Sequence, residues 1–159
     1  MIFTGVNVHI RSGSGQTRDN DKPLGLGNLI VGYNELAGAL PRTGSHNLVV
    51  GPEHSYTSTG GFVAGLHNSV SGLFSSVSGG ASNKAEGAYN SISGGQGNRT
   101  AFDAATVSGG LQNTARGNWS TVSGGQLNTA STNYTTVSGG KQKTASVFNA
   151  WVGGDYHTP

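Results

Sequence analysis

The sequence predicts an all-β fold, a parallel β-solenoid whose coils each contain fifteen residues. One observation is the pentapeptide Thr-Val-Ser-Gly-Gly, which begins at Thr121 and again at Thr136. A second is that apolar, glycine and asparagine positions keep the same spacing over most of the chain. The unit is too short for a helical repeat of about 33 to 47 residues or a propeller blade of about 40 to 50. It suits one solenoid coil with two short strands and two corners, whereas a flexible Gly/Ser linker has no reason to keep residues in register.

Each coil is expected to begin with an apolar residue that points into the interior. Polar residues flank it, as in Thr121-Val122-Ser123, and this alternation of β-branched residues favours a strand. The lead residues of the successive coils are Phe62, Val77, Ile92, Val107, Val122, Val137 and Val152.

Two further columns are expected at the corners. A Gly-Gly pair follows the lead residue in most coils and supplies positive φ without steric cost, as at Gly124 and Gly125. Asparagine tolerates left-handed backbone, and stacked asparagine side chains can form a buried ladder. The asparagine column contains Asn68, Asn83, Asn98, Asn113 and Asn128, and Lys143 interrupts it.

The chain divides into four parts. Residues 1–24 are expected to form an initial strand, which includes Val6, Val8 and Ile10, and then a polar, mobile loop. Residues 25–60 are expected to be irregular coils with an insertion, and residues 61–154 the regular repeats. Residues 155–159 are expected to cap the solenoid, because Asp155 ends the glycine column and terminal repeats are atypical.

Composition excludes several classes of protein. Charged residues make up 10% of the chain and the net charge is +2, with no basic stripe, so nucleic-acid binding is not expected. No apolar run reaches the roughly 18 to 20 residues of a membrane span, so no membrane insertion is expected. The first residues lack the pattern of a signal peptide, so no export signal is expected in this chain. The absence of cysteine excludes disulfides and fits any compartment.

The interior of such a coil is thin. Burial of one valine stabilises by roughly 1.5 kcal/mol or slightly more, whereas ordering each residue costs about 1 to 2 kcal/mol before other terms offset it. A glycine column in a strand also often marks the close approach of another backbone. Both points predict a homo-oligomer whose chains pack side by side.

The repeat, as it stands at Ser76–Asn90 and Thr121–Thr135, resembles the head repeat of trimeric autotransporter adhesins, the YadA-like head. That unit reads roughly S-V-A-I-G, a short spacer and A-x-G-x-x-S. Val122, Gly125 and Ala130 match its Val, Gly and Ala, whereas Gly124 stands where the family has Ile. The family pattern also has a second glycine. This chain keeps it at Gly87 and Gly117, but the equivalent residues of other coils are Phe102, Thr132 and Val147.

This resemblance covers about residues 45 to 155. It implies a left-handed parallel β-roll, a side-by-side homotrimer and exposure on a bacterial surface. The segment GLGNLIVGYNE precedes the Ser-Gly-Gly repeats. With it, the whole chain also looks like the distal part of longer bacterial or phage-like trimeric fibre proteins.

Two surface features are candidate ligand-binding sites. Alternation places hydroxyl groups in two parallel ladders on one outer face, at Thr106, Ser108, Thr121, Ser123, Thr136 and Ser138. An aromatic column contains Phe74, Tyr89, Trp119 and Tyr134. This column either fills interior space next to Gly124 and its equivalents or forms an exposed stripe on which sugars stack.

No residue pattern predicts catalysis, a cofactor or a metal. His46, His54 and His67 lie in irregular coils without the three or four converging ligands that a metal requires, although a trimer axis could bring copies of one histidine together. The seven acidic residues are scattered along the chain. No phosphate-binding or dinucleotide-binding glycine motif is complete.

These observations together predict a non-enzymatic head or tip domain of a trimeric surface fibre, an adhesin for a glycan or a surface protein. The alternatives are an ice-binding solenoid that uses the hydroxyl ladders, a phage-type tail spike that cleaves glycans with carboxylates from several subunits, and a purely structural spacer.

Overall fold

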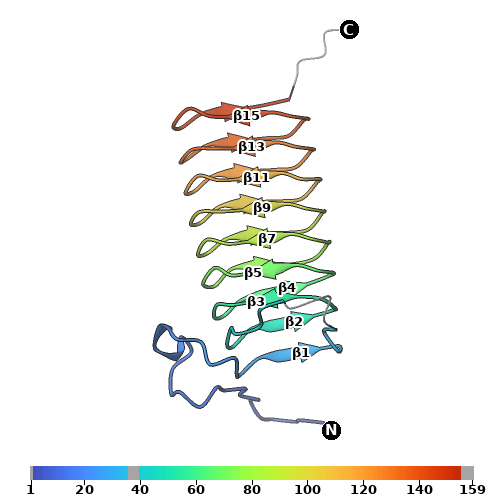
Figure 1. The fold of residues 1–159 in the computed structure, drawn as a ribbon, viewed down its shortest axis with the longest axis vertical. Helices are drawn as coiled ribbons and strands as arrows, with labels where there is room; N and C mark the ends of the chain where they lie inside the picture. Colours follow the sequence, from blue (N-terminus) through green and yellow to red (C-terminus); the bar gives the residue numbers. More distant parts are fainter. Residues whose placement is uncertain (1, 36–39, 155–159) are drawn as a thin grey trace.

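The structure, a computed structural model, describes residues 2–35 and 40–154. It confirms the predicted all-β parallel solenoid: successive coils stack in chain order along one axis, and all strand pairs are parallel (Figure 1). The only helix among the described residues is the short 3-10 turn η1 (Asp19–Asp21).

Two sheets form the walls of the solenoid. The nine-stranded sheet, called sheet A here, consists of β1 (Leu29–Val31), β2 (Leu48–Val50), β4 (Phe62–Ala64), β6 (Ser76–Val77), β8 (Ser91–Ile92), β10 (Thr106–Val107), β12 (Thr121–Val122), β14 (Thr136–Val137) and β16 (Trp151–Val152). The seven-stranded sheet, called sheet B here, consists of β3 (Ser55–Tyr56), β5 (Ser69–Val70), β7 (Lys84–Ala85), β9 (Arg99–Thr100), β11 (Thr114–Ala115), β13 (Thr129–Ala130) and β15 (Thr144–Ala145).

The spacing between paired residues changes along the chain. Stacked asparagines are 15 residues apart in the later coils, but equivalent positions are 14 apart earlier and 19 apart at the first pair of coils. The prediction that Phe62 is the inward-pointing lead residue of its coil is wrong. Val63 pairs with Val77 and is 1% exposed, while Phe62 pairs with Ser76. Val63 is followed by Ala64 and one glycine, one residue fewer than in later coils, and this deletion shifts the register.

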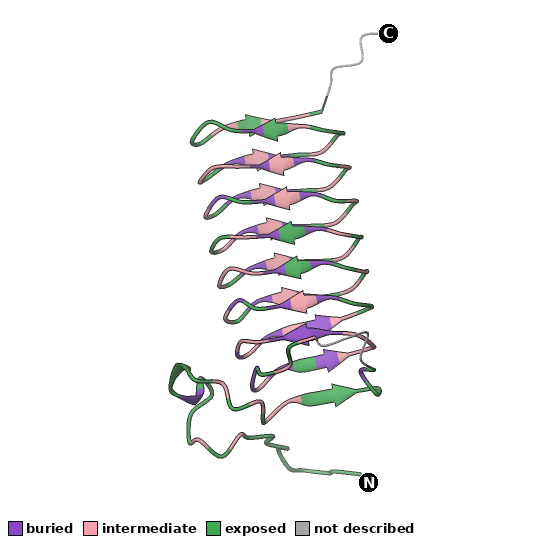
Figure 2. Ribbon diagram, in the orientation of Figure 1, coloured by how far each residue is buried: buried purple, intermediate pink, exposed green. Residues whose placement is uncertain are grey.

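The core is a narrow column between the sheets. Val122 is fully buried, while Thr121 is half-buried and Ser123 is exposed, as the predicted alternation requires. Sheet B contributes small residues such as Ala115 and Ala130, which are also fully buried. Figure 2 shows buried residues, in purple, along the stacked strands. One apolar side chain from each sheet therefore makes up most of the interior of a regular coil.

The two glycines of each pair have different roles. A Cβ on Gly125 would lie 2.1 Å from the oxygen of Gly140, and φ is +86° there, so only glycine fits. A Cβ on Gly124 or Gly94 would meet nothing within 4 Å. The first glycine of the pair therefore faces open space and does not belong to the interior.

The predicted asparagine ladder is present at the corner before sheet B. Oδ1 of Asn98 accepts a hydrogen bond from the backbone N–H of Asn113 at 2.9 Å. Its Nδ2 donates to the carbonyl oxygens of Gly94 and Gly110 at 2.9 and 3.0 Å. The amides therefore bind backbone groups of their own coil and of the next coil rather than one another. All five predicted members are buried: Asn68, Asn83, Asn98, Asn113 and Asn128.

The N-terminal part differs from the expectation. Residues 6–10 belong to neither sheet, so the predicted initial strand is wrong. The polar loop after them is organised around Asp19, whose carboxylate accepts hydrogen bonds from the hydroxyls of Ser12 and Ser14 and from the N–H of Leu24. These hydroxyl groups hold the pKa of Asp19 well below its usual range. The predicted cap at residues 155–159 lies outside the described residues.

Candidate functional site

The structure brings the six predicted hydroxyl residues together on the outer face of sheet A. Thr106, Thr121 and Thr136 pair in register on adjacent strands. The serines that directly follow these strands, Ser108, Ser123 and Ser138, are exposed. The threonine ladder ends at Trp151, which pairs with Thr136, and the Trp151 indole N–H donates to Oγ of Ser138 at 2.7 Å.

The aromatic column points outward, so it does not fill interior space. Trp119 and Tyr134 are 53% and 47% exposed and stack with ring centroids 4.9 Å apart and planes 7° apart. Phe74 and Tyr89 form a looser stack, with centroids 6.0 Å apart. Trp119 and Tyr134 have φ of +54° and +58°, and this left-handed corner places their side chains on the surface.

Phe148 extends this aromatic surface, and sequence reasoning missed its role. Its ring packs edge-on against Tyr134, with centroids 5.4 Å apart. Phe148 also borders a shallow groove of about 390 Å³, whose lining residues are Phe102, Arg116, Gly117, Asn118, Ser131, Thr132, Asn133 and Phe148. The available signal was that Phe102 and Phe148 are bulky residues in columns whose other members are mostly smaller.

Sequence reasoning also missed a threonine ladder on sheet B. Thr114, Thr129 and Thr144 pair in register across three adjacent strands. The signal was the recurring Thr-Ala dipeptide, in which the alanine is buried and the threonine faces outward. Hydroxyl ladders therefore occur on both sheets of the solenoid.

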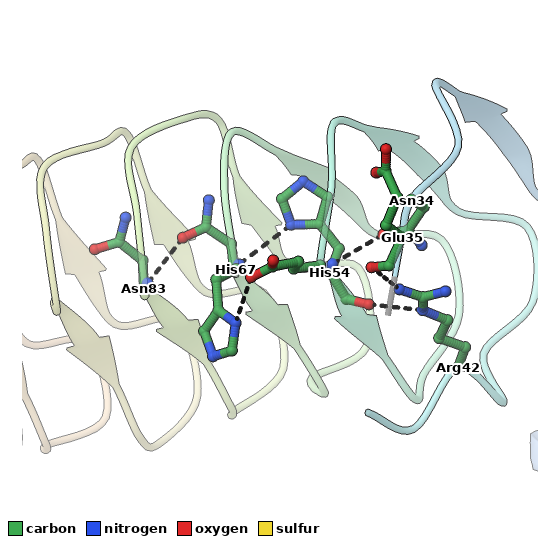
Figure 3. A network of polar contacts seen from close by, with 8 residues as sticks. Asn34, Glu35, Arg42, His54, His67 and Asn83 are labelled. Carbon is green, nitrogen blue, oxygen red and sulfur yellow. Dashed lines mark hydrogen bonds and ion pairs between the residues drawn. The ribbon is translucent and has the colours of Figure 1, made fainter. Parts of the chain in front are cut away.

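His54 occupies an asparagine position in the ladder. Its Nδ1 accepts a hydrogen bond from the N–H of Asn68 at 3.2 Å, and Nε2 lies 3.0 Å from the oxygen of Val50, to which it donates in the neutral tautomer. Its own N–H donates to Oδ1 of Asn34 at 2.9 Å (Figure 3). Burial lowers the pKa of His54, which favours this neutral form.

The other two candidate histidines also bind groups of their own chain. Nε2 of His46 accepts a hydrogen bond from the N–H of Ser12 at 3.1 Å. Nδ1 of His67 lies 3.3 Å from a carboxylate oxygen of Glu53. Within residues 2–35 and 40–154, no three His, Cys, Asp or Glu side chains are grouped so that they could hold a metal ion.

The carboxylates of the solenoid are separated and mostly engaged. Glu86 binds Arg99 with an oxygen–nitrogen distance of 2.6 Å. Oδ1 of Asp103 accepts a hydrogen bond from the N–H of Ala88 at 2.9 Å. Nothing in these contacts pairs two carboxylates for acid–base chemistry.

The chain matches no known family model and no curated protein. The similarity to the adhesin head repeat therefore rests on the motif residues and remains a prediction. Among the described helices, none has the length and apolar character needed to cross a membrane.

Proposed function

We propose that this protein is the non-enzymatic head or tip domain of a trimeric fibre on a cell surface, and that it acts as an adhesin for a glycan or a surface protein. The observation that carries the proposal is the exposed aromatic stack of Trp119 and Tyr134 on a regular solenoid. Exposed Tyr and Trp side chains are typical of recognition surfaces, because each combines a large apolar ring with a polar O–H or N–H group. Sugar rings stack readily on such faces.

The open glycine column supports side-by-side assembly. A side chain at Gly94 would meet no atom of the same chain within 4 Å and φ is not positive there, so its absence has no explanation within one coil. A flat stripe without side chains allows the backbone of another subunit to approach closely. The thin Val/Ala core favours the same conclusion, and the repeat motif favours a left-handed β-roll of fifteen-residue coils in a homotrimer.

The engagement of the carboxylates supports a binding role over a hydrolytic one. Glu86 and Asp103 hold neighbouring groups of their own chain, and Glu53 faces His67. A glycan-cleaving tail spike requires an acid and a base or nucleophile that flank one bond. The proposed function is therefore adhesion without catalysis.

The test is a binding assay with the whole chain on printed glycans and on wells coated with extracellular-matrix proteins. The double variant Trp119→Ala/Tyr134→Ala should lose at least tenfold in apparent affinity for the ligand found. Tyr33→Ala, which removes a 93% exposed aromatic from another part of the chain, should leave binding unchanged. Binding that survives the double variant, or no binding to any surface, would contradict the proposal.

A further inference from the structure

We propose that the groove between Phe102 and Phe148 binds a carboxylated saccharide, one that carries sialic acid or a uronic acid. This inference rests on the proposed adhesive function and names the ligand class. The groove is called the Phe102–Phe148 groove below. It lies on the described, regular part of the solenoid and has a volume of about 390 Å³.

Four successive coils build the groove. Phe102 stands one coil before Gly117 and Asn118, and Phe148 stands one coil after Asn133, since these positions follow each other at a step of 15 residues. The two phenyl rings, 57% and 60% exposed, therefore mark its two ends along the axis. Three coil steps at the strand spacing of about 4.8 Å separate them by about 14 Å, which suits a short oligosaccharide.

Gly117 lines the groove one coil after Phe102. A Cβ on Gly117 would lie 1.9 Å from the oxygen of Thr132, so no larger residue fits there. Because no side chain stands at Gly117, backbone forms the wall of the groove one coil after the bulky Phe102. Phe102 is the only bulky side chain among three successive equivalent positions, because glycines stand one coil before it, at Gly87, and one coil after it, at Gly117.

The lining offers hydrogen-bond donors. Oδ1 of Asn118 accepts from the N–H of Asp103, and Oδ1 of Asn133 accepts from the N–H of Asn118, both at 2.9 Å. These bonds fix both amides and leave their Nδ2 groups for a ligand. Oγ1 of Thr132, which also lines the groove, is buried and has no hydrogen-bond partner in the described part of the chain. Fixed amide and hydroxyl donors suit sugar hydroxyl and carboxylate oxygens.

Arg116 gives the groove its charge preference. Its side chain is exposed and lines the groove, and among the described residues no carboxylate pairs with it. Arg99, by contrast, is bound to Glu86. Asp103, the acidic residue nearest in sequence, does not line the groove. A guanidinium binds a carboxylate through two parallel hydrogen bonds, so an acidic sugar is preferred over a neutral one.

The aromatic end of the groove is continuous with the proposed adhesive surface. Phe148 packs edge-on against Tyr134, and Tyr134 stacks on Trp119. A saccharide whose acidic sugar lies near Arg116 can therefore extend over Phe148 onto this stack. The groove supplies charge recognition and the stack supplies apolar contact.

The experiment measures binding of the whole chain to two matched pairs of probes by biolayer interferometry at low salt. One pair is 3′-sialyllactose and lactose, and the other is a hyaluronan hexasaccharide and chitohexaose. We expect at least one acidic probe to bind tenfold or more tightly than its neutral counterpart, and the two pairs distinguish sialic from uronic acid. Phe102→Ala and Arg116→Gln should each weaken that binding tenfold or more.

Two matched variants serve as controls. Tyr33→Ala removes an exposed aromatic outside both the groove and the aromatic column, and Lys84→Gln removes an exposed cation on sheet B, so both should bind within twofold of the wild type. Circular dichroism should show that all four variants are folded. Equal affinity for acidic and neutral probes, no binding of any acidic probe, or acidic binding unchanged in Phe102→Ala and Arg116→Gln would overturn the inference. Retention on matrix proteins or neutral glycans in any of these cases would leave the adhesin proposal standing.

Discussion

At the scale of single residues, His54 shows how different chemistry satisfies one structural position. Asparagine in the ladder presents an acceptor to the coil that follows and a donor to the carbonyl four residues back. Neutral imidazole does the same through Nδ1 and Nε2, which face the N–H of Asn68 and the oxygen of Val50. His54 can replace asparagine in this way only when its Nδ1 carries no proton, so the stability of this corner depends on pH.

Acid should therefore destabilise the solenoid at His54. Its pKa is lowered mainly by burial, with a further contribution from the charge of Arg42, so the unfolded chain binds the proton more readily. The stabilising effect of the neutral form is complete above the unfolded value of 6.5 and is lost as pH falls below it through the folded pKa. The melting temperature of the wild type should fall from pH 7.5 to pH 5.

The variant His54→Asn isolates this effect, because it restores the residue used in the other coils. Its melting temperature should depend less on pH over the same range than that of the wild type. His67→Asn, which changes an exposed histidine beside Glu53, is the matched control and should still lose stability in acid, because it keeps His54. If His54→Asn and the wild type lose stability equally in acid, the assignment of the neutral imidazole is wrong.

At the scale of the repeating element, the side chain of the corner asparagine joins its own coil to the next one. Oδ1 of Asn113 accepts from the N–H of Asn128 at 2.9 Å, and its Nδ2 donates to Gly109 and Gly125 at 2.9 and 2.8 Å. These backbone groups are away from solvent, so water cannot replace the amide. The outer Asn118–Asn133 contact has similar geometry but is only partly buried.

This difference predicts unequal costs for two alanine substitutions. Asn113→Ala should lower the free energy of unfolding by about 3 kcal/mol or more, because it leaves several buried backbone groups unsatisfied. Asn133→Ala should cost under about 1 kcal/mol, since water can reach the group it exposes. Urea denaturation of both variants would measure this, and equal costs would show that the ladder is not the main stabilising element of the corner.

The repeat made the strands and the asparagine corner predictable, because period-two alternation and a fixed spacing each have one structural solution. The direction of Trp119 was not predictable in this way. It lies at a left-handed corner, where alternation along a strand does not apply. The groove was missed because its lining comes from four coils, and only stacking brings Phe102 and Phe148 to the ends of one hollow. The register at Phe62 failed because one missing residue moves every side chain of a strand to the other face.

At the scale of the whole molecule, the chain forms an elongated stack with little interior (Figure 1). The regular coils bury valine from sheet A and alanine from sheet B, as at Val137 and Ala145. Several large apolar side chains are exposed near the N-terminal coil, among them Leu29, Ile30 and Val31. An isolated chain of this shape leaves much apolar surface in water, which favours association.

Sedimentation equilibrium should accordingly give particles of three chains, each of 16.1 kDa. The variant Gly94→Lys should dissociate them while the chain stays folded, because the new side chain enters space that is empty within one chain but blocks the approach of a neighbour. Gln96→Lys adds the same charge at a nearby exposed position and should leave the assembly intact. A folded wild-type monomer at micromolar concentration would contradict the trimer.

The direction of the inter-coil hydrogen bonds has a mechanical consequence. Both sheets and the asparagine ladder bond one coil to the next, so these bonds lie along the long axis. A tensile load applied at the two ends of the stack pulls the bonds open lengthwise instead of shearing the strands, and it acts on all coils in series. The terminal coil, which has a neighbour on one side, yields first. Each unit of 15 residues that unfolds adds about 50 Å of extended chain. Under force the molecule therefore lengthens coil by coil, starting from its end.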